Sequence, residues 1–321
     1  MSVPERLVIV SPARDEADYA ERTLASVAAQ TRPPDLWVVV DDGSSDATPE
    51  ILARWSERLP YLRVVRRDQR PTRSVGPGVV RAFYAGLATV DLDDFAYLCK
   101  LDLDLDLPPR YFELLLARMA AEPRVGTCSG KPYFPSPGGA LVSEMVGDDV
   151  SAGMTKLFRT SCFRQIGGFV REVMWDGIDC HRCRMLGWIA ESWDDPDLRF
   201  VHLRPMGSSH RGILTGRMRH GFGQHFMGTG LGFMTASAVF RMTRPPLVIG
   251  GLAMWWGFVR SALAGNPRLE DPDFRRFLRA YQRRMLRVGK RRALDELHAA
   301  GAARWDPSRP SPWPDASGDE T

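Results

Sequence analysis

The chain has 321 residues, 44% of them hydrophobic, and a formal net charge of +4. It can therefore bury a full core, which excludes a wholly disordered chain, and we expect one large domain with a C-terminal appendage. The distribution of charge matters more than its total: acidic residues concentrate between Asp41 and Asp106, whereas arginines dominate the C-terminal third.

We expect no secretory signal in residues 1–12, because no cationic start is followed there by a long apolar core. We therefore expect the chain to remain in the cytoplasm, and its five cysteines fit a reducing compartment. Cys180 and Cys183 form a lone C-x-x-C pair around His181, with no second pair at zinc spacing. We expect this pair to pack within a helix.

The first third of the chain alternates between strands and helices. Leu7–Val10 and Leu36–Val40 are apolar runs of strand length, and residues 18–30 and 48–59 have helical spacing. This order predicts an α/β fold: a mostly parallel sheet with right-handed crossovers, flanked by helices. Nearly all-apolar strands such as Leu36–Val40 are typical of such sheets.

Three aspartates follow the next predicted strand, Phe95–Cys99. Asp102, Asp104 and Asp106 alternate with leucines, so in an extended backbone their carboxylates project together. A shared divalent cation with oxygen ligands, Mg²⁺ or Mn²⁺, would relieve their repulsion. The alternative is an acidic loop that caps the helix predicted over residues 110–119.

The carboxyl ends of parallel strands form one rim of a sheet, where ligands of such sheets bind. Residues 11–16, 41–46 and 102–106 each follow a predicted strand, so we expect all three polar clusters along this rim. Gly43 permits a tight turn, and Asp42 can accept hydrogen bonds from a base or ribose. A nucleoside site beside a cation suits a nucleotide diphosphate.

These segments resemble the family 2 inverting glycosyltransferases of the GT-A fold. The resemblance covers about the first 190 residues and rests on Val8–Glu16, Ser26–Thr31, Val40–Thr48 and the Asp102-x-Asp104 motif. The form Asp-x-Asp-x-x-x-Pro-Pro is similar to the dolichol-phosphate mannose synthase branch.

The resemblance implies a nucleotide-diphosphate sugar donor, with Pro12, Ala13, Glu16 and Asp42 around the nucleoside. It also implies Mn²⁺ or Mg²⁺ near Asp102 and Asp104, with Asp106 as a third candidate ligand. Arg14 and Asp15 replace the usual Tyr-Asn pair, so Arg14 either faces the diphosphate or pairs with Asp15.

A second matching segment runs from Phe158 to Gly187 and is similar to the family's Gly-Gly-Phe and Glu-Asp region. By its distance from Gly168, Asp176 aligns with the base that removes a proton from the acceptor hydroxyl, and Asp179 is the runner-up. Trp175 stands in the place of the usual glutamate. In such an inverting transfer the hydroxyl attacks the anomeric carbon directly, so no protein nucleophile is needed.

Other residues near these motifs have two interpretations each. The glycines of residues 76–86 serve packing or contact a phosphate, and Lys100 approaches the phosphates or forms a salt bridge. Some GT-A enzymes use a C-terminal histidine as a metal ligand, which makes His202 a candidate. Arg204 and Arg211 flank a Gly-Ser-Ser turn that could form a lid over the diphosphate.

The C-terminal third contains two apolar segments, residues 226–240 and 245–259, both shorter than a membrane-spanning helix requires. They predict either a buried helical hairpin or a pair of helices embedded in one membrane leaflet. The arginine-rich helix predicted over residues 274–292 suits an anionic membrane surface. Apart from Phe277 and Tyr281 it lacks the aromatic platforms of a nucleic-acid site, so we expect no nucleic-acid partner.

We accordingly predict a catalytic domain over residues 1–212, a membrane-associated helical extension over 213–300 and a disordered tail over 301–321. The predicted function is metal-dependent sugar transfer to a glycan or lipid-linked acceptor, in cell-surface polysaccharide or glycolipid synthesis at the inner face of the cell membrane. Alternatives are a non-catalytic nucleotide-sugar-binding protein and, less favoured, a nucleotidyltransferase, whose glycine-rich, lysine-containing loop is absent from residues 7–16.

Overall fold

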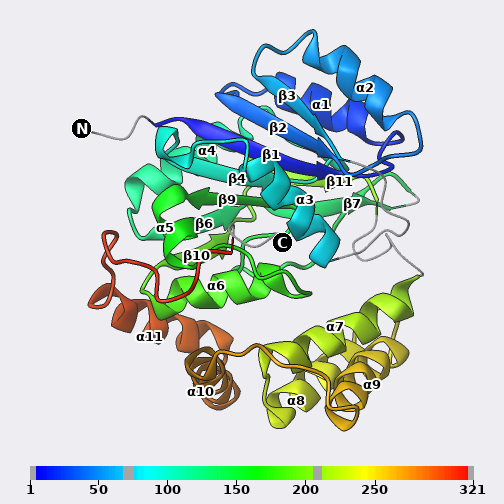
Figure 1. Cartoon of the computed structure of the whole chain (residues 1–321). Coiled ribbons are helices and arrows are strands. Elements are labelled where there is room, and N and C mark those ends of the chain that lie inside the picture. The colour runs from blue at the N-terminus through cyan, green and yellow to red at the C-terminus, as the bar shows by residue number, and fades with distance from the viewer. Residues whose placement is uncertain (1–4, 68–75, 137, 205–211, 317–321) are drawn as a thin grey trace.

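The computed structural model describes residues 5–67, 76–136, 138–204 and 212–316. A twisted sheet forms the centre of the molecule, with helices on both faces and a separate group of C-terminal helices to one side (Figure 1). The predicted α/β class is confirmed, including the C-terminal helices.

The central sheet has seven strands in the order β10-β6-β9-β4-β1-β2-β3. The pairs β1–β2, β1–β4, β2–β3 and β6–β10 are parallel, and β9 runs antiparallel to its neighbours β4 and β6. The strands are β1 (Leu7–Ala13), β2 (Leu36–Asp41), β3 (Leu62–Arg66), β4 (Tyr97–Leu101), β6 (Val125–Ser129), β9 (Thr155–Arg159) and β10 (Ile189–Ser192).

The sheet separates two hydrophobic cores, because alternate residues of a strand point to opposite faces. Leu7 and Ile9 enter the core that contains residues of α1, α2 and α4, whereas Val8 and Val10 enter the core with residues of α3, α5 and α6. Burial on both faces explains why β1 and β2 are almost entirely apolar. The helices are α1 (Ala20–Ala28), α2 (Thr48–Ser56), α3 (Pro77–Leu87), α4 (Tyr111–Ala121), α5 (Thr160–Gln165) and α6 (Trp175–Met185).

A smaller sheet brings the acidic segment beside a distant part of the chain. Its order is β5-β11-β7-β8, with β5 (Leu105–Asp106), β7 (Lys131–Pro135), β8 (Leu141–Ser143) and β11 (Arg199–His202). The antiparallel register of β5 and β11 places His202 opposite Leu105. Two short 3₁₀ helices, Leu92–Asp94 and Pro196–Leu198, precede β4 and β11.

Five helices form the C-terminal part: α7 (Ile213–Met227), α8 (Leu231–Met242), α9 (Ile249–Leu263), α10 (Pro272–Val288) and α11 (Lys290–Ala302). The first predicted apolar segment is divided between α7 and α8, because Gly228 adopts a left-handed conformation with φ 83°. A Cβ at Gly221 of α7 would lie 2.0 Å from the Met254 carbonyl oxygen of α9, so the glycine permits a close helix contact. None of the helices in the described part of the chain is long and apolar enough to cross a membrane.

The segment after α11 contacts the rest of the chain within the described residues, which extend to 316. Trp305 packs edge-to-face on Trp188, with ring centroids 5.4 Å apart. Trp313 stacks under the guanidinium of Arg182 at 4.6 Å and donates a hydrogen bond to Asp271 at 2.6 Å. The two indoles bury apolar surface in these contacts. The Pro-, Ser- and Asp-rich composition of the segment did not indicate this burial.

The two glycines Gly86 and Gly232 provide a matched test of packing, because both lie within helices. A Cβ at Gly86 of α3 would lie 2.6 Å from Val40 Cγ2, whereas a Cβ at Gly232 of α8 would meet no atom within 4 Å. We predict that Gly86→Ala destabilises the fold by about 1–3 kcal/mol through overpacking. Gly232→Ala should instead stabilise it by about 0.5–1 kcal/mol. Chemical unfolding measures both, and an unchanged Gly86→Ala protein would contradict this packing.

Candidate functional site

The carboxyl ends of β1, β2 and β4 lie next to one another at one rim of the central sheet. Ala13 of β1 is in register with Asp41 of β2, and Val10 of β1 with Lys100 of β4. The backbone N–H of Asp42 donates to the Ala13 carbonyl at 2.8 Å. The polar segments after these strands are therefore neighbours in space.

The loops after β1 and β2 are joined by hydrogen bonds. Asp15 has φ 52°, and its Oδ1 accepts from the backbone N–H of Ser45 at 2.8 Å. Its own backbone N–H donates to Ser44 Oγ at 3.0 Å. Arg14 Nε lies 3.8 Å from Asp15 Oδ2, so of the two predicted roles of Arg14 the structure contains the pairing with Asp15.

The predicted nucleoside-binding carboxylates are buried and face arginines. Asp42 is 8% exposed, and its Oδ1 lies 3.3 Å from Arg67 Nη1. Glu16 is 6% exposed, and its Oε1 lies 2.9 Å from Arg204 Nη2. Pro12 and Ala13 are the last residues of β1 and lie at the same rim.

Each of the three aspartates after β4 has a different cationic partner. Asp102 pairs with Lys100 at 2.5 Å, Asp104 with Arg204 at 2.7 Å, and Asp106 with Arg22 at 2.8 Å. Burial raises the pKa of Asp102, and the nearby Asp104 carboxylate adds to this rise while Lys100 opposes it. The predicted repulsion thus acts between Asp102 and Asp104, and it is balanced by cationic side chains of the chain itself.

Arg204 connects the loop after β1 to the acidic segment. Its guanidinium contacts both Glu16 and Asp104 and lies 5.4 Å from the centre of the Tyr19 ring. Burial alone would lower the pKa of Arg204, but the Asp104 and Glu16 carboxylates raise it above its ordinary value. The guanidinium therefore stays charged and neutralises two buried carboxylates.

His202 lies between two carboxylates. Its Nε2 is 3.5 Å from Asp104 Oδ2, and its Nδ1 is 2.7 Å from Glu144 Oε2. Burial would lower the pKa of His202, but its hydrogen bonds to Asp104 and Glu144 raise the pKa to about 9. The imidazole is consequently held as a cation beside Asp104 at neutral pH.

The residues at this rim fit a divalent cation only with substrate oxygens completing its shell. Asp104 Oδ1 is buried and has no hydrogen-bond partner among the described residues, so one carboxylate oxygen is available beside His202. No group of three or more His, Cys, Asp or Glu side chains able to hold a metal ion occurs in the described ranges. Mg²⁺ commonly binds through one or two carboxylates together with substrate phosphates, and this donor set suits that mode.

Asp176 lies in the first turn of α6, close to the acidic segment. A Cβ at Gly153 would lie 2.6 Å from Asp176 Oδ2, so the carboxylate rests directly against the Gly153 backbone. The Gly153 carbonyl in turn accepts from Lys100 Nζ at 3.0 Å. Gly153 therefore contacts both Asp176 and the Lys100–Asp102 pair.

Asp179, the runner-up base, is fully buried and paired with Lys156. Both side chains are 0% exposed, and Lys156 Nζ also donates to the Asp176 carbonyl at 2.8 Å. Burial would lower the pKa of Lys156, but the Asp179 carboxylate raises it above its ordinary value. This pair anchors α6 to β9 and is closed to an acceptor.

Trp175 and Lys156 are site components that the sequence did not single out together. Lys156 of β9 is in antiparallel register with Lys100 of β4. The ring of Trp175 lies 5.2 Å from Lys100 Nζ and 5.7 Å from Lys156 Nζ. Such stacking stabilises both buried ammonium groups, and only the strand register could have revealed it.

The remaining predicted features have different positions. Gly76 precedes α3 with φ 90°, and Gly86 packs against β2. Cys180 and Cys183 are buried within α6, as expected for helix packing. The predicted Gly-Ser-Ser turn and Arg211 fall within residues 205–211, which lie outside the described residues.

The geometry is that of a mixed α/β protein with a cluster of buried polar side chains at its sheet rim. Residues 8–163 match the family model described as "Glycosyl transferase family 2". This range extends from β1 into α5 and includes the acidic segment. The fold and the match together support a glycosyltransferase.

The solved structures that are similar to this chain include the following three. The mannosyltransferase PcManGT from Pyrobaculum calidifontis, in complex with GDP-Man and Mn²⁺, has TM-score 0.51 and 20% identity over 93% of this chain and 86% of its own. GalNAc-T7 with UDP, GalNAc and Mn²⁺ has TM-score 0.50 and 14% identity over 64% of this chain and 45% of its own. S. aureus TarS 1-349 in complex with UDP-GlcNAc has TM-score 0.49 and 15% identity over 94% of this chain and 92% of its own.

At these identities the first two structures show the shared GT-A fold alone. No curated protein matches the chain. The similarity to the dolichol-phosphate mannose synthase branch therefore stays a prediction from the sequence motif.

The Lys156–Asp179 pair gives a stability test. We predict that Lys156→Met destabilises the protein by about 3–5 kcal/mol, because it leaves the Asp179 charge buried without a partner. Adding Asp179→Leu should restore much of the loss, since no buried charge then remains. Guanidinium unfolding followed by circular dichroism measures both variants.

Arg276→Met is the matched control, because Arg276 pairs with Asp273 at 3.3 Å on the exposed surface of α10. It should leave the unfolding midpoint unchanged. Equal effects of Lys156→Met and Arg276→Met would contradict the assignment of the buried pair.

Proposed function

We propose that this chain transfers a sugar from a nucleotide-diphosphate donor to an acceptor hydroxyl, with inversion at the anomeric carbon. The observation that carries the proposal is the position of Asp176: its carboxylate lies against the Gly153 backbone, whose carbonyl accepts a hydrogen bond from Lys100. A carboxylate beside the metal motif can act as the base of a direct displacement. The family match supports the same class of reaction.

The donor nucleoside would bind at the ends of β1 and β2. In this proposal Asp42 accepts hydrogen bonds from the base or ribose, while Pro12, Ala13 and Glu16 form the adjacent wall. Arg67 and Arg204 hold the two carboxylates in place, at 3.3 Å from Asp42 and 2.9 Å from Glu16. Arg14, paired with Asp15, then stabilises the loop after β1 next to this wall.

The diphosphate would lie over Asp102 and Asp104. A bound Mn²⁺ or Mg²⁺ ion supplies positive charge against the charge that develops on the leaving diphosphate. In this proposal the buried Asp104 Oδ1 holds that ion, and His202 Nε2 joins it only after the imidazolium has released its proton, because a metal ligand must be a neutral imidazole. Asp102 lies beside them, and Asp106 is the remaining candidate. Arg204 can exchange its contact with Asp104 for a diphosphate oxygen, since its guanidinium presents several donors.

The acceptor hydroxyl would approach Asp176. The carboxylate accepts the hydroxyl proton as the oxygen attacks the anomeric carbon. Lys156 donates a hydrogen bond to the Asp176 carbonyl and so fixes the backbone that carries this carboxylate.

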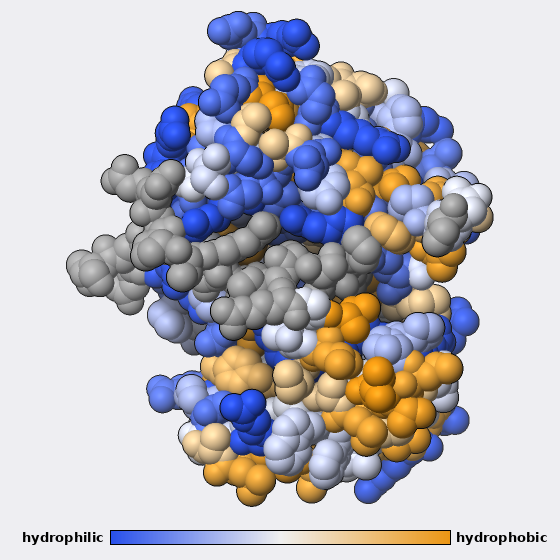
Figure 2. All heavy atoms as spheres, turned by 90° about the vertical axis from the view of Figure 1, so that its right-hand side faces the viewer, coloured by the Kyte–Doolittle hydropathy of each residue, from blue (hydrophilic) through white to orange (hydrophobic). Residues whose placement is uncertain are grey.

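We also propose that the C-terminal extension docks on an anionic membrane surface, at the inner face of the cell membrane. Apolar side chains gather over the part of the molecule formed by these helices (Figure 2), and about half or more of the surface of many of them is exposed. They include Leu231, Val239, Phe240, Leu247, Val248, Ile249, Leu252, Trp256 and Leu263. Patches of this kind mark membrane or protein interaction sites, and the basic helix α10 favours the membrane. A glycan or lipid-linked acceptor, as in polysaccharide or glycolipid synthesis, fits this location.

Asp176→Asn is expected to reduce sugar transfer about 10²- to 10⁴-fold, the usual contribution of a general base. Donor binding should be retained, because the amide preserves the shape of the side chain. Transfer is measured with a panel of nucleotide sugars and binding by calorimetry, with Asp273→Asn on exposed α10 as the control. If the wild-type protein binds donor without transferring or hydrolysing it, the proposal fails and a non-catalytic binding protein remains.

Asp104→Ala is expected to abolish the dependence of UDP or GDP binding on Mn²⁺. Metal affinity requires a carboxylate oxygen at this position, and the variant removes the buried Oδ1. Asp106→Ala, measured beside it, should have a smaller effect because Asp106 pairs with Arg22. Calorimetric titration with and without Mn²⁺ provides the comparison, and normal Mn²⁺-dependent binding by Asp104→Ala would refute the assignment.

A further inference from the structure

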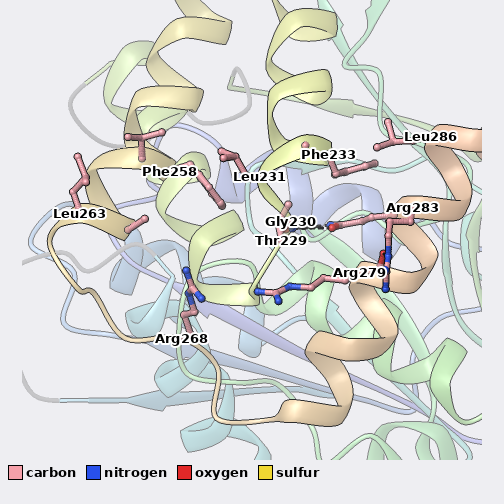
Figure 3. Close-up of a pocket in the computed structure, with 14 residues that line it drawn as sticks. Thr229, Gly230, Leu231, Phe233, Phe258, Leu263, Arg268, Arg279, Arg283 and Leu286 are labelled. Carbon is pink, nitrogen blue, oxygen red and sulfur yellow. Dashed lines mark hydrogen bonds between the residues drawn. The ribbon is translucent and has the colours of Figure 1, made fainter.

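A cavity of about 750 Å³ lies among α8, α9 and α10 (Figure 3). Its lining residues come from the segments 229–233, 258–263 and 268–286, and none of them belongs to the candidate sugar-transfer site. A volume of this size is within the range of pockets that hold small organic ligands.

One wall of the cavity is apolar. Leu231 of α8 lies on the side of Phe258 and Leu263 of α9, whereas Phe233 of α8 points toward Leu286 of α10 (Figure 3). Leu231 and Leu263 are 59% and 78% exposed, so the wall continues into the exposed apolar patch of the same helices. The cavity therefore opens where we propose that the extension meets the membrane.

The other wall is cationic and lacks counter-charges. Arg268, Arg279 and Arg283 line it, and none of the three has a carboxylate partner in the described ranges. Other arginines of the same helices are paired: Arg276 with Asp273 at 3.3 Å, Arg284 with Glu296 at 2.7 Å and Arg292 with Glu296 at 3.2 Å. Three arginines without a carboxylate partner in the described ranges thus meet at the cavity.

The polar end of the cavity is held by hydrogen bonds. Gln282 is 3% exposed; its Oε1 accepts from the backbone N–H of Gly230 at 3.1 Å, and its Nε2 donates to Thr229 Oγ1 at 3.2 Å. Arg279 Nε donates to the Gly228 carbonyl at 3.0 Å. These contacts fix the base of the guanidinium group and leave its outer N–H donors directed at the cavity.

We propose that this cavity binds one anionic phospholipid, with an acyl chain along the apolar wall and the headgroup phosphate against Arg279, Arg283 and Arg268. Guanidinium groups bind phosphate oxygens through charge-assisted hydrogen bonds, and the apolar wall suits a hydrocarbon chain. This inference rests on the membrane part of the proposed function and adds a specific lipid site to it. Sugar transfer itself does not depend on it.

The test measures binding of a single lipid to the full chain in solution. Dioctanoyl-phosphatidylglycerol, below its critical micelle concentration, is titrated calorimetrically and compared with dioctanoyl-phosphatidylcholine and with glycerol 3-phosphate. We expect one molecule of the anionic lipid to bind, with the other two at least about tenfold weaker, since each lacks either the net charge or the hydrocarbon chain. Equal binding of the two lipids, or of glycerol 3-phosphate, overturns the proposal.

A pair of double variants tests the contact between the arginines and the headgroup phosphate. The double variant Arg279→Gln with Arg283→Gln should weaken binding about tenfold or more, as expected for lost charge-assisted hydrogen bonds. Arg287→Gln with Arg291→Gln removes the same charge from residues that do not line the cavity, and it should bind like the wild type. If both double variants bind equally, the effect is general surface charge and the site is refuted.

Gly232→Leu tests the tail. Gly232 lines the cavity and a Cβ there meets no atom within 4 Å, so the leucine enters free space without disturbing the fold. We expect it to weaken lipid binding several-fold while its circular dichroism and unfolding midpoint stay at or above wild type. Unchanged affinity in a folded Gly232→Leu protein contradicts an acyl chain in this cavity.

Flotation with phosphatidylglycerol vesicles distinguishes the specific lipid site from the proposed docking of the C-terminal extension on a membrane. If the protein floats but binds no monomeric lipid, membrane docking stands and the specific site is wrong. If it binds monomeric lipid but does not float, the site stands and the membrane docking is wrong.

Discussion

The ion pairs of Arg204 with Glu16 and Asp104, at 2.9 and 2.7 Å, are the contacts on which the candidate site depends. Carboxylates taken out of water are costly unless cations and hydrogen bonds compensate them. Arg204 provides this compensation for two strand ends that are distant in sequence. Lys100 does the same for Asp102, so the rim is held together before any ligand arrives.

Local patterns of apolar residues in the sequence predicted the fold, because each pattern reflects which side chains are buried. The apolar runs of β1 and β2 are buried on both faces, and the leucines that alternate with the aspartates enter the core, with Leu105 at 0% exposed. Asp102 and Asp104 could be recognised from the sequence for the same reason. The positions of Lys156, Trp175 and Arg22 could not, because each depends on strand register or on a contact between distant segments.

The C-terminal part shows a different limit of sequence reasoning. Apolar composition predicted helices over residues 226–259 but left open whether they are buried. In the structure α8 and α9 pack on each other with a single shared core that includes Met234 and Met254, while many larger side chains remain outside. Conversely, composition predicted a disordered tail, because two tryptophans contribute little to it. In the structure Trp305 packs on Trp188, and Trp313 contacts Arg182 of α6 and donates to Asp271 just before α10.

The central claim is that the rim around Arg204 receives a nucleotide diphosphate and a divalent cation, and a crystal structure of the chain with UDP or GDP and MnCl₂ tests it most directly. Anomalous diffraction at manganese would locate the ion. The account predicts a peak bonded to the Asp104 carboxylate and to diphosphate oxygens, with the nucleoside beside Asp42 and Arg204 turned toward the diphosphate. Nucleotide bound elsewhere, or a manganese-free rim with Arg204 still joining Glu16 to Asp104, would contradict it.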